Sequence, residues 1–182
     1  VCGSGGAGAA TRAAEMLKVP LKVINITEEY LELLKKPKHG YGANINPCID
    51  CKIFMLKRSK AYMTEVGASF LVTGEVLGER PMSQRMDALH LIEREAGVKG
   101  ILLRPLTAKC LELTEPEKAS VVDREKLLAI QGRSRKPQME LAVKFGISEY
   151  PNPAGGCLLT DPGFSNRVKD LFKYGPITSE EM

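Results

Sequence analysis

Three cysteines carry the strongest chemical signal in the sequence. Cys48 and Cys51 stand three apart in the segment Asn46-Pro47-Cys48-Ile49-Asp50-Cys51-Lys52, and Cys157 follows Gly155-Gly156. We expect a helix to begin near Cys51, where exposed N–H groups and the helix dipole favour a thiolate. The two neighbouring sulfurs can then face one point. A thiolate is the form that binds a metal or attacks sulfur, so this pattern indicates a reacting centre or a metal site.

The residues alone leave several kinds of cysteine site open. A single CxxC is typical of a redox pair or of half a structural zinc site. Zinc normally takes four ligands, the sequence has no second CxxC, and His39 is a weak fourth candidate in a loop. Three cysteines suit an iron–sulfur cluster with one open iron better than a closed zinc site.

Two further segments have side chains or backbone suited to a nucleotide or a base. Thr73-Gly74-Glu75 ends a predicted strand, and ligands of α/β sheets bind at the carboxyl ends of strands. A plain tight turn is the alternative there. Ser83 and Gln84 lie in a loop with donors for a phosphate or a base, whereas a helix start capped by Ser83 is equally compatible.

A basic run precedes a predicted helix at Pro137. Arg133, Arg135 and Lys136 place three cations in four residues. Such a run suits RNA phosphates, although a solvated basic turn is the commoner meaning.

Helices and strands alternate along the part of the chain that positions these residues. We predict helices at 9–17, 51–66 and 83–96, and strands at 21–26, 70–73 and 101–104. N-cap residues and first-turn prolines predict the starts of four further helices, at Thr27, Asp123, Pro137 and Asp161-Pro162. The alternation predicts an α/β fold with a mainly parallel sheet. Few strand signals follow residue 106, so we expect domains at 1–106 and 107–182, the second mostly helical.

The composition limits the class of protein. Of the 182 residues, 43% are apolar and 26% charged, an ordinary globular balance, and the net charge of +4 permits an anionic partner. No apolar run approaches a membrane span, and no signal peptide is visible. Five cysteines at uneven spacing make a poor disulfide framework and favour a reducing compartment. We therefore expect a cytoplasmic protein without a membrane partner.

The order of these segments resembles the PP-loop ATP pyrophosphatases that thiolate transfer RNA, in particular the 2-thiouridine synthetase type. The resemblance covers about residues 7–160 and rests on the first helix and predicted strand, Asn46-Pro47 with its cysteines, the strand ending at Gly74, and the Gly-Gly-Cys turn. It implies a Rossmann-like fold, that of the adenine nucleotide alpha-hydrolases. It also implies ATP with Mg²⁺ and a tRNA substrate.

The resemblance also implies roles for individual residues. Cys51 matches the family's nucleophile, and Cys157 matches the cysteine that carries persulfide sulfur. Gly74 matches a strand-end glycine that contacts the nucleotide. By looser match, Glu75, Ser83 and Gln84 would lie near the RNA base.

Two departures from that family shape our expectations. The family's first strand ends in Ser-Gly-Gly-x-Asp-Ser, whereas residues 4–9 read Ser-Gly-Gly-Ala-Gly-Ala. We expect the true phosphate loop and first strand to lie upstream of Val1, so that this chain alone binds ATP poorly. Cys48 stands where the synthetase type has Asp. A CxxC with a third cysteine instead resembles the iron–sulfur branch, in which Cys48, Cys51 and Cys157 would hold a [4Fe-4S] cluster.

These observations lead to one main hypothesis and two rivals. The main hypothesis is an ATP-dependent tRNA sulfurtransferase that makes thiouridine and receives sulfur from sulfide or a persulfide carrier. The first rival is a cluster-free enzyme that uses a persulfide on Cys157 with Cys51. The second is a non-catalytic, zinc-stapled module that binds RNA or protein, whose stability would be lost on chelation.

Overall fold

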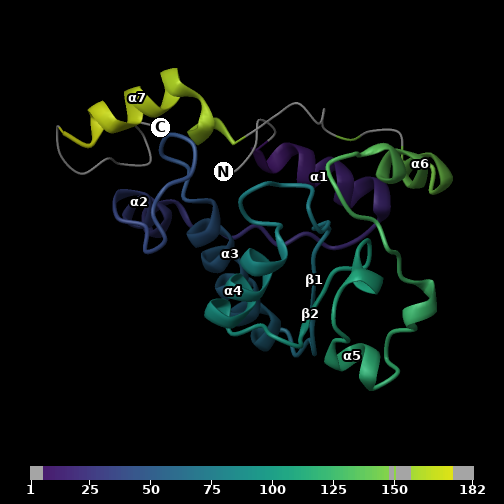
Figure 1. Ribbon diagram of the computed structural model, residues 1–182. Helices are drawn as coiled ribbons and strands as arrows, with labels where there is room; N and C mark the ends of the chain where they lie inside the picture. The colour runs from purple at the N-terminus through teal and green to yellow at the C-terminus, as the bar shows by residue number, and fades with distance from the viewer. Residues whose placement is uncertain (1–5, 148–149, 151–156, 174–182) are drawn as a thin grey trace. The chain divides into compact units, whose positions relative to one another are not determined.

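The computed structural model describes residues 6–147, 150 and 157–173 (Figure 1). Contacts group the chain into two compact units. Residues 48–134 form one, here called the central unit, and residues 1–47 with 135–182 form the other, here called the terminal unit. The sequence-based division into 1–106 and 107–182 follows strand signals rather than contacts, and it stays a prediction.

The central unit contains two parallel strands joined by a helix. After helix α3 (Cys48–Glu65) come strand β1 (Leu71–Val72), helix α4 (Met86–Ala96) and strand β2 (Leu102–Leu103). Leu71 pairs with Leu102 and Val72 with Leu103. Parallel neighbours need a crossover between them, and α4 supplies it. The α/β prediction with a parallel sheet is confirmed, in agreement with a Rossmann-like domain, although each strand is shorter than its predicted range.

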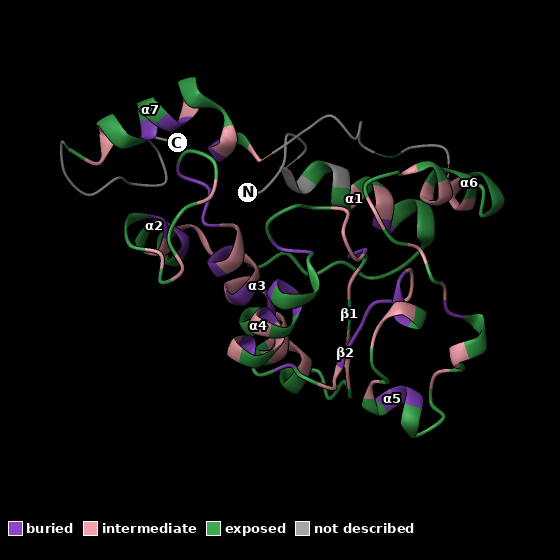
Figure 2. Ribbon diagram, viewed as in Figure 1, coloured by how far each residue is buried: buried purple, intermediate pink, exposed green. Residues whose placement is uncertain are grey.

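The core of the central unit lies on both sides of β2 (Figure 2). Successive strand residues point to opposite faces of a sheet, so Leu102 and Leu103 join different clusters. Leu102 packs with buried residues of α3, α4 and the turn after α4, namely Ile53, Leu56, Ile92, Ala96 and Val98. Leu103 packs with Ala108 and Leu127. This packing anchors α3 against the strands.

The rest of the central unit consists of short helices. They are η1 (Ala108–Cys110), α5 (Glu115–Lys118) and η2 (Arg124–Lys126), and η1 and η2 are 3₁₀ helices. The Asp123 side chain accepts a hydrogen bond from the Glu125 N–H and caps η2. The cap predicted at Asp123 is thus confirmed.

The terminal unit is built of helices among its described residues. These are α1 (Gly6–Leu17), α2 (Thr27–Lys35), α6 (Lys136–Lys144), η3 (Leu158–Thr160) and α7 (Pro162–Leu171). The helices predicted at 9–17 and from Asp161-Pro162 are confirmed. Asp161 caps α7 by accepting from the Phe164 N–H, and Pro162 lies in the first turn. In the part of the chain that the structure describes, each helix is too short or too polar to cross a bilayer.

The strand predicted at 21–26 is wrong. Residues 19–26 form no strand, and Val23 is 63% exposed. A strand needs a neighbour for its backbone groups, and an apolar, β-branched run cannot supply that neighbour itself. The Asn25 side chain instead accepts from the N–H and the hydroxyl of Thr27, at 3.0 and 2.8 Å. Thr27 is therefore the first residue of α2 rather than its N-cap, which is Ile26, and Asn25 bonds the first N–H of the helix.

Two helix starts also differ from prediction. Helix α3 begins at Cys48, three residues before the predicted Cys51, and α4 begins at Met86 rather than Ser83. Ser83 and Gln84 belong to a closed turn before α4 instead. The first difference matters most, because it brings both cysteines of the CxxC into one helical turn.

Candidate functional site

The first turn of α3 presents the two cysteines of the CxxC. Residues three apart lie on the same side of a helix, so Cys48 and Cys51 share one side of this turn. Cys48 is half-buried, and Cys51 is 5% exposed. Neither forms a disulfide. The turn also has the N–H groups of a helix start, which lack partners within the helix.

An ion network joins this turn to the ends of both strands. The Lys52 ammonium lies 3.1 Å from Glu75 Oε1. Arg104, directly after β2, donates from Nε to Glu75 Oε2 at 3.0 Å and from Nη1 to Glu93 on α4. Thr73 Oγ1 lies 3.2 Å from the same Glu75 oxygen. One carboxylate thus connects α3, β1 and β2, and Arg104 extends the network to α4.

Glu75 stays ionised at the centre of this network. Glu75 is 5% exposed and Arg104 is 2% exposed. Burial pushes the pKa of Glu75 upward, but the Lys52 ammonium and the Arg104 guanidinium outweigh it, so the pKa lies below its usual value. The two cations and the two carboxylates of the network sum to zero charge, which is the condition for burying such groups.

Gly74 lies at the open end of β1, beside this network. It is exposed, and a Cβ placed on it would meet no atom within 4 Å. The backbone at the carboxyl end of β1 is therefore accessible to a ligand. This is the position at which α/β sheets bind nucleotides.

The three residues predicted to lie near a base are all buried. Glu75 is held in the ion network, and Ser83 is 1% exposed. Gln84 closes a loop, because its Oε1 accepts from the Arg80 N–H at 2.9 Å and its backbone carbonyl accepts from the Gly78 N–H. These contacts stabilise the loop and the strand ends. Contact of Glu75, Ser83 and Gln84 with RNA stays a prediction.

Cys157 belongs to the terminal unit, where it precedes η3. It is half-buried, and its carbonyl accepts from the N–H and the hydroxyl of Thr160, at 2.8 and 2.6 Å. The Thr160 carbonyl accepts in turn from Asn44 Nδ2 at 2.7 Å. Residue 44 is part of the loop that leads into Cys48. Gly155 and Gly156 of the predicted Gly-Gly-Cys turn, and most of the glycine-rich segment 4–9, lie outside the described residues or have no described side chains.

The basic run straddles the boundary of the two units. Arg133 falls in the central unit, and Arg135 and Lys136 fall in the terminal unit. Arg133 and Lys136 are exposed and Arg135 is half-buried. Binding of RNA by these cations stays a prediction.

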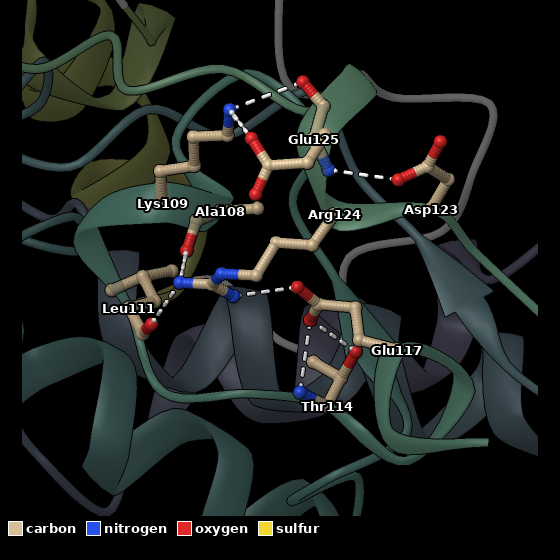
Figure 3. A network of polar contacts seen from close by, with 8 residues as sticks. All are labelled: Ala108, Lys109, Leu111, Thr114, Glu117, Asp123, Arg124 and Glu125. Atoms are coloured by element: carbon tan, nitrogen blue, oxygen red, sulfur yellow. Dashed lines mark hydrogen bonds and ion pairs between the residues drawn. The ribbon is translucent and has the colours of Figure 1, made fainter. Parts of the chain in front are cut away.

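A cavity of about 520 Å³ borders the ion network, with Glu93 and Arg104 in its lining. A second network includes other residues of the lining, namely Ala108, Leu111, Thr114 and Glu117 (Figure 3). Arg124 donates from Nη1 to Glu117 at 2.6 Å and from Nη2 to the carbonyls of Ala108 and Leu111. Glu117 also accepts from the N–H and the hydroxyl of Thr114, which completes a capping box at α5.

Two of the three predicted cluster ligands fit a metal centre by their placement. Cys48 and Cys51 offer two sulfurs from one turn, as cluster and zinc sites require. Within 6–147, 150 and 157–173, no three His, Cys, Asp or Glu side chains group as a metal site would. Cys157 lies in the other unit, so the three-sulfur site stays a prediction.

Lys52, Glu93 and Arg104 are the members of the site that sequence reasoning missed. Lys52 follows Cys51, and Arg104 ends a predicted strand, so both stood beside residues already singled out. A cation at the end of one predicted strand and an acid at the end of another are the sequence signal that could have paired Arg104 with Glu75. Glu93 shows no such signal in a helix rich in charge.

Comparison with known proteins gives one match, to a family model. No curated protein and no solved structure matches this chain. The model described as thiamine biosynthesis protein (ThiI) matches residues 9–112, more than half of the 182 residues. The match includes α3 with its two cysteines, both strands and all four members of the ion network. The chain belongs to this ThiI family.

Proposed function

We propose that this protein is an ATP-dependent tRNA sulfurtransferase that makes thiouridine. Membership of the ThiI family supports sulfur transfer to tRNA at the level of the family. The observation that carries the finer proposal is the placement of the first turn of α3, residues 48–51, here called the cysteine turn. Two thiols on the first turn of α3 are tied by Lys52 and Glu75 to the end of β1, next to the accessible Gly74.

The proposed reaction has two stages. A carbonyl oxygen of the base attacks the α-phosphorus of ATP, and pyrophosphate leaves. Sulfide then adds to the activated carbon, and AMP leaves with the former carbonyl oxygen. The net change is C=O plus ATP plus hydrosulfide to C=S plus AMP plus pyrophosphate, with no change in redox state. An iron–sulfur cluster, where bound, would supply the sulfide from its open iron.

Three groups of residues in this chain would have separate roles. Gly74 would let the adenine nucleotide, with Mg²⁺, approach the strand end closely. Cys48 and Cys51 would hold the cluster together with Cys157. Arg133, Arg135 and Lys136 would contact tRNA phosphates, because three cations in four residues suit a polyanion.

Replacement of Cys48 tests the proposal. Full-length Cys48→Ala is prepared anaerobically, reconstituted with iron and sulfide, and assayed for bound iron and for thiolated tRNA. We expect both to fall nearly to background, because a four-iron cube would keep only two protein ligands. Cys110→Ala is the matched control, since Cys110 is also half-buried but lies on η1. We expect it to keep both iron and activity.

The rival functions predict other outcomes. Full thiolation by Cys48→Ala without iron would favour the persulfide route, in which Cys51 and Cys157 suffice. Bound tetrahedral zinc and no ATP-dependent turnover by the unaltered protein would favour the zinc-stapled module.

A further inference from the structure

An ion pair connects the cysteine turn to the strand ends. Lys52 directly follows Cys51, and its ammonium lies 3.1 Å from Glu75 Oε1. The Lys52 side chain is 30% exposed, whereas that of Glu75 is 5% exposed. The pair therefore reaches from the partly exposed helix turn into the buried end of β1.

The two halves of this pair are held with different rigidity. Glu75 is fixed from the strands, because Arg104 and Thr73 both contact its Oε2. Its Oε1 faces Lys52 and accepts no regular hydrogen bond from the described residues. The first turn of a helix lacks half of its backbone hydrogen bonds and frays most easily. A rigid buried carboxylate can hold such a turn in place through one lysine.

The charge count also gives Lys52 a specific role. Without Lys52, one positive charge, that of Arg104, would face the two negative charges of Glu75 and Glu93. Lys52 brings the second positive charge to the group. Loss of Lys52 would leave one uncompensated negative charge at the strand ends and would release the helix turn.

We infer that Glu75 is a positioning residue that acts through Lys52 to hold the Cys48–Cys51 turn against the carboxyl end of β1. This inference rests on the proposed function for its catalytic meaning. It replaces a base-contacting role of Glu75 with a role in the placement of the sulfurs.

Three variants of the full-length protein test this positioning. Lys52→Met removes the charge and keeps an aliphatic stem, and Lys52→Arg keeps the charge. Lys57→Met is the matched control, because Lys57 is an exposed lysine of the same helix. Peptide-resolved hydrogen exchange then follows the amides of residues 52–55, whose hydrogen bonds to residues 48–51 define the first turn.

We expect Lys52→Met to speed exchange of these amides about five- to tenfold, the effect of losing a partly buried ion pair. Lys52→Arg and Lys57→Met should stay within about twofold of the unaltered protein. In the thiolation assay, Lys52→Met should lower kcat by about ten- to a hundredfold while KM for ATP stays within about twofold. Misplaced reacting groups slow the chemical step rather than substrate binding.

Two results would overturn the positioning role. Equal exchange in Lys52→Met and Lys57→Met would show that the pair does not hold the turn. Failure of Lys52→Arg to protect the turn would show that a positive charge at residue 52 is not what holds it. Exchange is measured without turnover, so an unaltered protein that does not thiolate tRNA would refute the proposed function and leave the positioning role to be decided by exchange.

Discussion

Two buried carboxylates of the central unit, Glu75 and Glu117, are both paired with arginine, but the chain assembles them differently. Glu75 and Arg104 stand 29 positions apart, on the ends of two strands. Glu117 and Arg124 stand 7 positions apart, and Thr114 lies three residues from Glu117 (Figure 3). The first network exists only when α3, β1, α4 and β2 have come together. The second needs little more than its own segment.

The Glu75 network belongs to the candidate site, whereas the Arg124 network holds a segment next to it. The Glu75 network contains the lysine of the cysteine turn and the residues at the strand ends. The Arg124 network fixes the segment from Ala108 to Glu125 through carbonyls and a capping box. Damage to the first should therefore affect the whole central unit, and damage to the second should stay more local.

The largest effect is expected from Arg104→Met. This change removes the guanidinium that the buried Glu75 shares with the half-buried Glu93, and breaking a buried ion pair typically costs about 3–5 kcal/mol. Urea-induced unfolding followed by circular dichroism gives the free energy of unfolding. A loss below 1 kcal/mol would mean that water replaces the guanidinium easily, and the network would not hold the strand ends together.

A smaller loss is expected from Arg124→Met. Glu117 would keep both of its hydrogen bonds from Thr114, and the Ala108 carbonyl would keep its hydrogen bond from the Leu111 N–H. We expect a loss of about 1–3 kcal/mol in the same urea experiment. Hydrogen exchange should rise between residues 108 and 125 and stay unchanged in α3. Faster exchange in α3 would show that the two networks are coupled and would end the contrast between them.

Thr114→Ala should cost still less. It removes the hydroxyl of the capping box but keeps the ion pair between Glu117 and Arg124, so we expect about 1 kcal/mol. Thr114→Ser, which retains the hydroxyl, should be close to the unaltered protein. Equal losses for the alanine and serine variants would assign the effect to the methyl group instead of the cap.

The smallest effect is expected from mild acid. The pKa values of Glu75 and Glu117 both lie below the usual range of Glu, Glu75 against burial through its two cations and Glu117 against burial through Thr114 and Arg124. A lowered pKa stabilises the fold above the unfolded value, near 4.3, and this stability is lost as the pH falls through the folded value. Between pH 7 and pH 5 we expect a loss of only about 0.1 kcal/mol for each group.

Most of that acid-dependent loss should come below the unfolded pKa. Unfolding free energies measured from pH 7 down to acid conditions should show a shallower decline in Glu75→Gln and in Glu117→Gln than in the unaltered protein. A decline as steep in both variants as in the unaltered protein would place the acid-sensitive groups elsewhere.

Features that depend on neighbouring residues could be predicted from the sequence. Asp123 and Asp161 cap the helices that follow them, as their side chains and positions indicate. The alternation of helix and strand around β1 and β2 predicted a parallel pair. The cysteine turn was placed within three residues of its start, because Asn-Pro before a CxxC is a local signal.

Features that depend on a distant partner were mispredicted or missed. The run at 21–26 has the composition of a strand but no neighbour to pair with in the described chain, so it forms no strand and most of it is exposed. Lys52, Glu93 and Arg104 were missed as members of one network, because Arg104 reaches Glu75 across 29 positions of the chain.

The sequence by itself determined the reactive residue types, the CxxC spacing and the helical caps, since these follow from groups a few residues apart. Only the tertiary structure decided that Lys52, Glu75, Glu93 and Arg104 form one ion network, in which Glu75 and Arg104 are buried. The physical reason is that a charge is buried only when opposite charges reach it, and which charges do so depends on how strands and helices pack.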